Sequence, residues 1–380
     1  MSNFFQRSSY IQWVRDLVAA MEGQPGAVGL FDATMDEPLD LLRETAERVL
    51  SEPGQPRLRS VMGAGNPLVL GALADRYGVG REQILCTTGA LSGVSLVLKA
   101  LVRRGDHVLI ERPHLDTLVE LAAGQGADIG YIERSADDGA FDLDQVQDAL
   151  RPNTRLLLIT NLHNPSGALL SEADLGRLAE VAARGRTRIV VDEVYADYVH
   201  RLSGGRPAAC ISDVFVSINS LSKVYGLSSL KCGWVVADAR TIKEIAPAHT
   251  LHEFGMSKLT HALASLVLED DAPFTKAVRS VLGEAHPLVE AWARALREEG
   301  LIAGAVPAAG CMYFPRLPHV GDTRKFTAWL WREYAIAAAP GELFQSPGHI
   351  RIGFGRRADR LAPVLQRVAE ALRIYCGALA

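Results

Sequence analysis

Short apolar runs alternate with helical patterns between residues 83 and 192, and this alternation limits the fold more than any other feature of the chain. Strands are expected over 83–87, 107–110, 128–132, 155–160 and 188–192, separated by helices over 92–102, 115–123, 143–150 and 172–183. The strict alternation of strand and helix predicts a mostly parallel sheet with helices on both faces. The sequence therefore indicates an α/β fold, in which ligands bind at the carboxyl ends of the strands.

Two more apolar runs, 214–218 and 234–237, predict further buried strands. From about Thr241 the alternation stops, and helical patterns follow over 253–268 and 274–299. Because proline lacks a backbone N–H, Pro287 is expected to kink or break the second of these helices. The remaining residues predict a smaller α+β part, with strands over 310–315, 336–340 and 349–354 and helices over 322–334 and 358–375.

Helices are also expected ahead of the sheet, over 9–21, 39–50 and 68–77. The first carries apolar residues on one side, namely Ile11, Val14, Leu17 and Val18. A helix that precedes every core strand has to pack on something else, either a partner subunit or the mouth of a site. We expect residues 1–45 to form an N-terminal arm and part of a small domain, 46–275 a large domain, and 276–380 the small domain.

The composition argues against several classes of protein. Of the 380 residues, 48% are hydrophobic and 22% are charged, which is typical of a globular protein. The formal net charge of −4, without a long basic run, argues against nucleic acid and anionic membranes as partners. The five cysteines have no metal-ligand spacing, so we expect reduced thiols and no metal site. No apolar run reaches signal-peptide or membrane-spanning length, and we expect a cytoplasmic protein.

The stretch Ser220-Leu221-Ser222-Lys223-Val224-Tyr225-Gly226 places a lysine at the end of a predicted buried strand. A lone loop lysine is usually solvated. A lysine that condenses with an aldehyde has to be the free amine, so we expect a partly desolvated pocket or a cationic neighbour to lower its pKa. Ser220, Ser222 and Lys231 offer hydroxyls and a positive charge to a phosphate.

Four further stretches carry candidate site residues. Thr88-Gly89-Ala90-Leu91-Ser92 opens a helix, where backbone N–H groups and the helix dipole form a phosphate seat. Asn161 to Gly167 reads Asn-Leu-His-Asn-Pro-Ser-Gly, which is also a common kind of turn. Asp192 ends a buried strand, and a buried carboxylate needs a partner. Arg351, on an otherwise apolar strand, needs an anion, either a substrate carboxylate or a structural salt bridge.

Together these stretches resemble the motifs of the class I/II aminotransferase family, which belongs to the fold type I enzymes that depend on pyridoxal 5′-phosphate (PLP). The family patterns are Ser-x-Ser-Lys-x-x-Gly-x-x-x-x-Arg-x-Gly around the cofactor lysine, Asn-x-x-Asn-Pro-Thr-Gly, Asp-Glu-x-Tyr, and a C-terminal Arg-x-x-Phe. All four are present in the family's order between about residues 60 and 355, and Asp-Glu-x-Tyr is matched in full. The resemblance implies a large domain with a mostly parallel, seven-stranded sheet covered by helices, plus a smaller α+β domain.

The resemblance also assigns roles residue by residue. Lys223 forms the Schiff base with PLP and then moves the α-proton of the substrate. Asp192 pairs with the pyridine nitrogen, while Asn164 and Tyr195 face the phenolic oxygen of the cofactor ring. Arg351 and Asn164 bind the substrate α-carboxylate. The other cofactor-binding residues that the resemblance implies are Ala90, Leu91, Leu115, Ser220, Ser222 and Lys231.

Three positions depart from the family. Lys231 stands where most members have arginine, which keeps the charge but loses the two-pronged grip. The family has an aromatic residue that stacks on the cofactor ring where this chain has His114 and Leu115, and the sequence leaves open which of them covers the ring. Ser60 stands where a tyrosine usually reaches the phosphate of the other subunit.

The resemblance implies an aminotransferase that moves the amino group of an amino acid to a 2-oxo acid. The alternatives are an amino-acid oxidase such as an arginine oxidase, a cyclase or a β-lyase of the same fold, or a non-catalytic PLP-binding regulator. Such regulators usually carry a DNA-binding helix-turn-helix, for which there is no room before residue 40. We expect a homodimer, because the family builds its site between subunits and the first helix has no core of its own.

Overall fold

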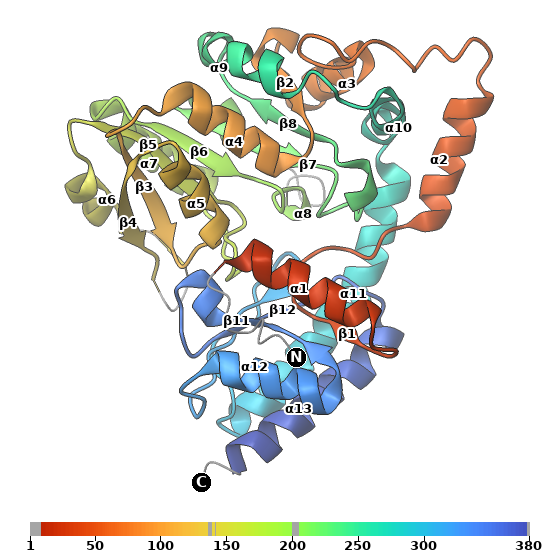
Figure 1. Cartoon of the computed structure of the whole chain (residues 1–380), viewed down its shortest axis with the longest axis vertical. Coiled ribbons are helices and arrows are strands. Elements are labelled where there is room, and N and C mark those ends of the chain that lie inside the picture. The colour runs from red at the N-terminus through yellow and green to blue at the C-terminus, as the bar shows by residue number, and fades with distance from the viewer. Residues whose placement is uncertain (1–8, 136–138, 141, 200–204, 378–380) are drawn as a thin grey trace.

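The computed structural model describes residues 9–135, 139–140, 142–199 and 205–377, and Figure 1 shows how they are arranged. The largest sheet has seven strands in the order β2-β8-β7-β6-β5-β3-β4. All neighbours are parallel except β8, which runs antiparallel to both β2 and β7. The strands are β2 (Ile84–Thr87), β3 (His107–Arg112), β4 (Asp128–Glu133), β5 (Thr154–Thr160), β6 (Arg188–Asp192), β7 (Phe215–Ser220) and β8 (Gly233–Val236). The predicted α/β fold with a mostly parallel sheet is confirmed.

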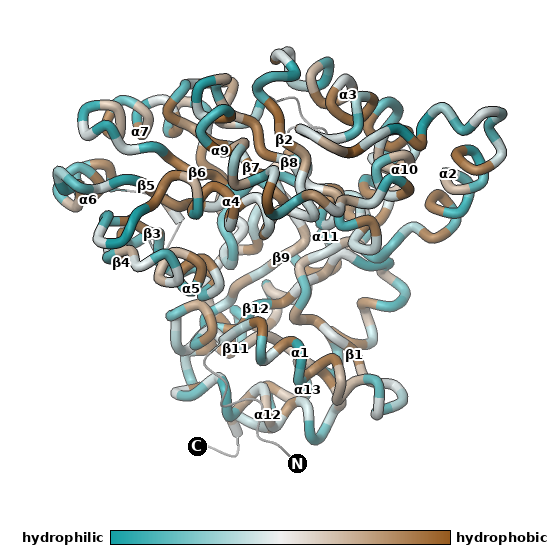
Figure 2. The backbone as a smooth tube through the Cα atoms, turned by 45° about the horizontal axis from the view of Figure 1, so that its top comes forward, coloured by the Kyte–Doolittle hydropathy of each residue, from teal (hydrophilic) through white to brown (hydrophobic). Residues whose placement is uncertain are grey.

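Helices cover both faces of this sheet. One face carries α4 (Ala90–Leu101), α5 (Asp116–Gly124) and α9 (Ala239–His252), and the other carries α6 (Leu143–Ala149) and α7 (Glu172–Arg184). Side chains alternate along β5, so that Leu156 and Leu158 face the first group of helices while Leu157 and Ile159 face the second. Figure 2 shows the resulting hydrophobic stretches along β5, β6 and β8 inside the molecule.

Four more helices follow: α3 (Pro67–Tyr77) packs on β2 and on α10 (Lys258–Glu269), α2 (Leu39–Ser51) packs on α10, and α11 (Ala272–Glu298) runs down to pack on α13 (Ala358–Gly377) of the smaller part. The helix predicted from residue 253 begins only at Lys258, where the Ser257 side chain accepts a hydrogen bond from the Thr260 N–H. Of the kink or break predicted at Pro287, the break is wrong, because α11 continues through this residue. Ala285 and Val289 on either side are fully buried, and this packing offsets the backbone hydrogen bond that proline removes.

The C-terminal region forms a smaller α+β part. Its antiparallel sheet has the order β11-β12-β9, from β9 (Met312–Tyr313), β11 (Ala339–Pro340) and β12 (Ile350–Gly353), and its helices are α12 (Thr323–Tyr334) and α13 (Ala358–Gly377). The N-terminal segment joins this part, because β1 (Val28–Gly29) pairs in parallel with β10 (Ile336–Ala337). No helix in the described ranges is long and apolar enough to cross a membrane.

Helix α1 (Tyr10–Glu22) lies between the large sheet and the smaller part (Figure 1). Its buried residues are Trp13 and Leu17, which pack against Phe31 and Phe344. The predicted apolar side is therefore wrong in part, because Ile11 and Val18 are 39% and 42% exposed. The sequence left open whether this helix packs on a partner subunit or at the mouth of a site. It packs on its own chain, at the mouth of the site described below.

Candidate active site

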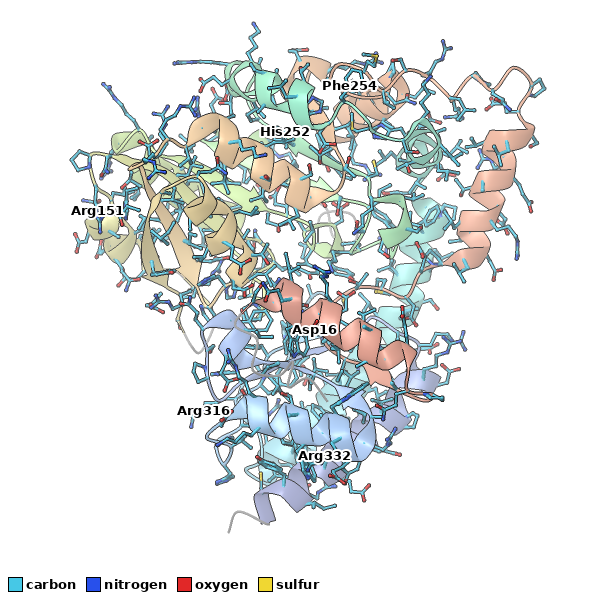
Figure 3. The ribbon with its side chains drawn as sticks, viewed as in Figure 1. Asp16, Arg151, His252, Phe254, Arg316 and Arg332 are labelled. Atoms are coloured by element: carbon cyan, nitrogen blue, oxygen red, sulfur yellow. The ribbon has the colours of Figure 1, made fainter. Side chains whose placement is uncertain are left out.

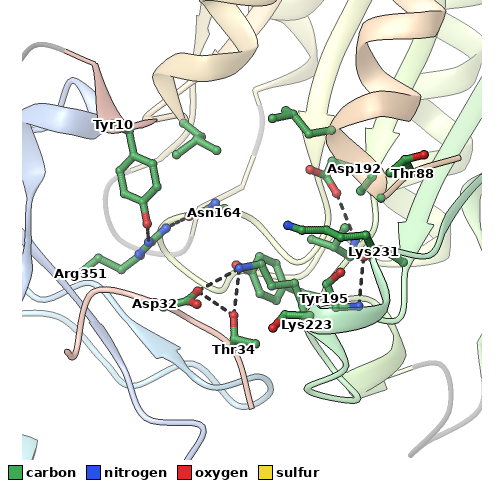
Figure 4. Close-up of a pocket in the computed structure, with 18 residues that line it drawn as sticks. Tyr10, Asp32, Thr34, Thr88, Asn164, Asp192, Tyr195, Lys223, Lys231 and Arg351 are labelled. Carbon is green, nitrogen blue, oxygen red and sulfur yellow. Dashed lines mark hydrogen bonds and ion pairs between the residues drawn. The ribbon is translucent and has the colours of Figure 1, made fainter. Parts of the chain in front are cut away.

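A pocket of about 450 Å³ lies at the carboxyl ends of the sheet strands, facing α1 and the smaller part (Figure 4). All eleven site residues predicted from the sequence line it: Ala90, Leu91, Leu115, Asn164, Asp192, Tyr195, Ser220, Ser222, Lys223, Lys231 and Arg351. The other lining residues were not among those predictions: Tyr10, Asp32, Thr34, Thr88, Gly89, Val194 and Ser228. Loops after β2, β5, β6 and β7 thus meet the N-terminal segment and β12 around one cavity.

One end of the pocket is suited to an anion. Gly89 precedes the first turn of α4 with φ of 84°, and a Cβ at Gly233 would lie 2.5 Å from its carbonyl carbon, so glycine is required for this close approach. Lys231 lines the same end, and it forms no ion pair with any residue that the structure describes. A cation beside a helix N-terminus fits a phosphate dianion.

The carboxylate of Asp192 faces the pocket from the end of β6. Its Oδ1 accepts a hydrogen bond from the Val194 N–H at 3.2 Å, and burial raises its pKa to about 6. A buried carboxylate with one backbone donor is stabilised by a cationic partner in the pocket, and the protonated pyridine nitrogen of PLP is such a partner. Tyr195 beside it is 3% exposed, and burial raises its pKa to about 12, so the phenol is a neutral donor at pH 7.

Lys223 is held by two oxygen atoms of the N-terminal segment. Its Nζ donates to Asp32 Oδ1 and to Thr34 Oγ1, both at 2.9 Å (Figure 4). Burial lowers the pKa of Lys223, but the neighbouring Tyr195 and the Asp32 carboxylate outweigh it and the net shift is upward. The expectation of a lowered pKa is therefore wrong for the chain without cofactor, because the neighbours are acidic groups and not cations. Lys223 has to lose a proton before it attacks an aldehyde, and the Asp32 carboxylate, whose pKa is lowered to about 2, stabilises the charged amine instead of accepting that proton.

Arg351 is fully enclosed by neutral oxygen acceptors. Its guanidinium donates to Asn164 Oδ1 at 2.7 Å, to the Tyr10 hydroxyl at 2.5 Å and to the Phe31 carbonyl at 2.6 Å. No carboxylate among the described residues pairs with it, so the structural salt bridge that was the alternative explanation is not present in those ranges. The positive charge at the pocket wall therefore suits an anionic group of the substrate.

A buried ion pair supports the loop that carries Asn164. Arg134 and Glu111 are both 0% exposed, with Nη2 and Oε2 2.6 Å apart. Glu111 Oε1 accepts from both the N–H and the hydroxyl of Thr160 at 2.6 Å. Thr160 Oγ1 in turn accepts from the Asn164 N–H at 2.8 Å. The position of Asn164 thus depends on charges beneath the site.

The structure separates the two residues that were candidates to cover the cofactor ring. Leu115 lines the pocket, whereas His114 is 0% exposed and stacks on Tyr131 with ring centroids 5.6 Å apart. Burial lowers the pKa of His114 to about 4, so its ring is neutral. His163 lies behind the pocket, where its ring nitrogens meet Ser166 Oγ and the Pro113 carbonyl.

Three pocket residues from the N-terminal segment, Tyr10, Asp32 and Thr34, were not predicted. Asp32 has a weak signal in the sequence, since it is a carboxylate directly after the apolar run Leu30-Phe31. Tyr10 has none, because its place depends on how α1 packs on the C-terminal part. No group of His, Cys, Asp and Glu side chains in the described ranges is arranged to hold a metal ion.

The chain matches the family model described as aminotransferase class I and II over residues 31–368. The capreomycidine synthase of Streptomyces vinaceus is 27% identical over 365 residues, which are 95% of this chain and 92% of that protein. A solved PLP-dependent aminotransferase from Streptococcus suis 89-1591 superimposes with a TM-score of 0.85 at 24% identity, covering 95% of this chain and 96% of that one. The PLP-dependent cyclase OrfR has the same TM-score at 23% identity, covering 97% and 98%.

The fold and the pocket define a PLP-dependent enzyme of fold type I. The family match spans most of the chain, and this protein belongs to the class I and II aminotransferase family. PLP is accordingly its cofactor. The pocket fits that group, because Lys231 and the α4 N-terminus suit its phosphate and Asp192 suits its ring nitrogen.

Proposed function

We propose that this protein transfers the amino group of an α-amino acid to a 2-oxo acid. The observation that carries the proposal is that Lys223, Asp192 and Arg351 line a single pocket. Transamination needs an amine that moves the α-proton, a carboxylate that keeps the cofactor ring protonated and a cation that binds the α-carboxylate. The family match supports this reaction class.

The residues that hold PLP divide into three groups. Lys231, Ser220, Ser222 and the first residues of α4, Ala90 and Leu91, hold the phosphate. Asp192 binds the ring nitrogen, while the Asn164 amide and the Tyr195 hydroxyl donate to the phenolic oxygen. Leu115 covers one face of the ring by apolar contact. When bound in this way, PLP supplies an electron-withdrawing ring that stabilises negative charge at the substrate α-carbon.

Lys223 moves the proton, and Asp32 orients its amine. With Oδ1 2.9 Å from Nζ, Asp32 holds the amine at the pocket and, with a pKa lowered to about 2, stays ionised when Lys223 loses its proton on attaching the cofactor. When the incoming amino acid displaces Lys223 from the cofactor, its amine is again a base beside the α-carbon. Lys223 would then be the base that takes the α-proton and the acid that gives it back, while bound PLP would supply the chemistry that retains the nitrogen and water would release the 2-oxo acid.

Arg351 orients the substrate through its α-carboxylate. The guanidinium exchanges the Tyr10 hydroxyl and the Phe31 carbonyl, its present partners, for the two carboxylate oxygens. The Asn164 side chain stays beside it and fixes the plane of the guanidinium. This grip holds the α-carbon in reach of Lys223 and excludes water from the polar end of the pocket.

Ring closure of a modified amino acid is a second candidate. It is favoured by the names of two similar proteins, the capreomycidine synthase and the cyclase OrfR. Both reactions begin with removal of the α-proton, so the same pocket serves either one. They differ in the product, because a transaminase keeps the nitrogen on its cofactor and releases a 2-oxo acid.

The attachment of PLP to Lys223 tests the cofactor assignment. Borohydride reduction of the wild-type protein with bound PLP should add one reduced cofactor to the peptide that contains Lys223. Lys223→Ala should gain no such mass, whereas Lys258→Ala, an exposed lysine outside the pocket, should gain it as the wild type does. A mass gain on another lysine of the wild-type chain would overturn the assignment.

We further propose a homodimer, with the domain boundaries expected from the sequence. The reason drawn from the first helix no longer holds, since α1 covers its apolar side within the chain. The support that remains is that the family builds its site between subunits, together with the exposed apolar side chains of Leu251 (79% exposed) and Phe254 (71% exposed, labelled in Figure 3) beside α9. Light scattering of the PLP-bound protein at micromolar concentration should give twice the chain mass of 41.1 kDa, and a monomer would overturn this proposal.

A further inference from the structure

We propose that Asp32 makes the pocket select amino acids whose side chain carries a positive charge, such as an ammonium or a guanidinium group. The inference rests on the proposed function and names its substrate class. Asp32 lies between β1 and α2 and lines the pocket beside Lys223 (Figure 4). Neither its sequence neighbourhood nor the family motifs assign it a role.

Asp32 lies between the two groups that hold the substrate. The carbonyl of the preceding residue, Phe31, accepts from Arg351 at 2.6 Å, and Asp32 Oδ1 accepts from Lys223 Nζ at 2.9 Å. Consecutive Cα atoms are about 3.8 Å apart, so both contacts come from one short piece of chain. A substrate held by its carboxylate at Arg351 and by its α-carbon near Lys223 therefore places its side chain within reach of Asp32.

The Asp32 carboxylate is oriented and open to the pocket. Thr34 Oγ1 donates to Oδ1 at 2.6 Å, which fixes the side chain. The side chain is 51% exposed, and Oδ2 accepts no hydrogen bond within the described ranges. Burial of the segment raises the pKa of Asp32. The Lys223 charge and the Thr34 hydrogen bond have the larger, opposite effect and lower this pKa to about 2, so the group is an anion at pH 7.

The charges in the pocket leave Asp32 without a counterpart on the cofactor. Five charged residues line the pocket in the described part of the chain: Asp32, Asp192, Lys223, Lys231 and Arg351. Lys231 matches the phosphate, Asp192 the ring nitrogen and Arg351 the α-carboxylate. Once the substrate has displaced it, Lys223 has to be the neutral amine that removes the α-proton, so Asp32 then loses its cationic partner. A cationic side chain of the substrate replaces that partner, whereas an acidic one is repelled.

Two simpler roles for Asp32 make different predictions. If Asp32 serves only to hold the Lys223 amine, its replacement changes the binding of every amino acid alike. If it binds the α-ammonium that all amino acids share, the loss is again uniform. Discrimination between a cationic side chain and a neutral one of equal size is expected only when Asp32 contacts the side chain itself.

The test compares dissociation constants of matched amino acids for the PLP-bound enzyme, read from the absorbance change on binding. The pairs are arginine against citrulline, and ornithine against norleucine. A hydrogen-bonded charge pair at a partly exposed carboxylate predicts that the wild type binds the cationic member about tenfold or more tightly. In Asp32→Asn this preference should shrink to about twofold or less. Asp36→Asn, an exposed carboxylate on the same segment, should keep the wild-type preference.

A length series gives the test a second arm. Asp32→Glu brings the carboxylate one methylene further into the pocket, so the tightest ligand among 2,4-diaminobutyrate, ornithine and lysine should become shorter by one carbon. This length series still tests the inference if Asp32→Asn fails to retain PLP. Equal binding of cationic and neutral members by the wild type, or a preference that survives in Asp32→Asn, overturns the inference while leaving the proposed function in place. Failure of every amino acid to change the absorbance overturns both.

Discussion

Replacing Glu111 should destabilise the protein through the charge that it leaves behind on Arg134. Both side chains are 0% exposed, and the Arg134 guanidinium also donates to the carbonyls of Gly139 and Thr160 at 2.7 and 3.0 Å. Glu111→Leu removes the carboxylate that pairs with this guanidinium at 2.6 Å. Breaking a buried pair by removing one partner costs about 3–5 kcal/mol.

The same substitution removes the acceptor of the Thr160 N–H. An unsatisfied buried donor costs about 1–3 kcal/mol, so Glu111→Leu should lower the free energy of unfolding by about 4–8 kcal/mol in total. Adding Arg134→Met removes the stranded charge but also the donor to the Gly139 and Thr160 carbonyls, so the double variant should recover only part of the loss. The double variant is therefore expected to be more stable than the single one.

Urea unfolding of the cofactor-free variants, followed by circular dichroism, measures these differences. The functional consequence is separate, because Thr160 Oγ1 positions Asn164, and both variants should bind amino acids more weakly than the wild type. Arg151→Met, which breaks an exposed ion pair with Asp128, is the control and should change the stability by less than about 1 kcal/mol. A double variant as unstable as Glu111→Leu alone would refute the reasoning, since the stranded charge would then carry no cost.

Two further predictions concern charges at and beside the site. Lys231→Ala should weaken PLP binding by about 1.5–3 kcal/mol, the size of a hydrogen bond to a charged group, while Lys231→Arg should keep it; equal retention of PLP on dialysis would show that Lys231 does not bind the phosphate. Burial raises the pKa of Glu193 from 4.5 to about 8. Between these values the unfolded chain is ionised while the folded one is protonated, so stability falls as the pH rises through this window. Glu193→Gln should avoid that loss. The melting temperature of Glu193→Gln minus that of the wild type should therefore increase between about pH 4.5 and about pH 8 and stay constant above it; a difference that does not change with pH would contradict the raised pKa.

The sheet could be predicted from the sequence because its strands are short, apolar and separated by amphipathic helices. Buried strands such as Thr154–Thr160 need both faces covered, so their composition alone indicates their place. Helix α9 was missed because His249, Pro247 and His252 weaken its helical pattern, although the Asp238 side chain caps its first turn. Helix α11 continues through Pro287, where local propensity predicted a kink or break, because tertiary packing stabilises the helix there.

The residues at the strand ends could be predicted, but the N-terminal side of the site could not. Motif residues such as Asn164 and Asp192 lie directly after strands, and the fold brings the carboxyl ends of strands together. Tyr10 and Asp32 reach the pocket only because α1 packs against Phe344 and β1 pairs with β10. These long-range contacts have no local pattern in the sequence. The raised pKa of Lys223 was missed for the same reason, since it depends on Asp32.

A single turnover without oxygen tests the central proposal most directly. The PLP-bound enzyme is mixed with an excess of an amino acid that changes its absorbance, in the absence of any 2-oxo acid, and the products are counted after one turnover. Transamination by Lys223 predicts one equivalent of 2-oxo acid per chain, no free ammonia, and a cofactor that regains its original absorbance only when a 2-oxo acid is added. Release of ammonia, a cyclised amino acid, or product that forms only when air is admitted would contradict the proposal.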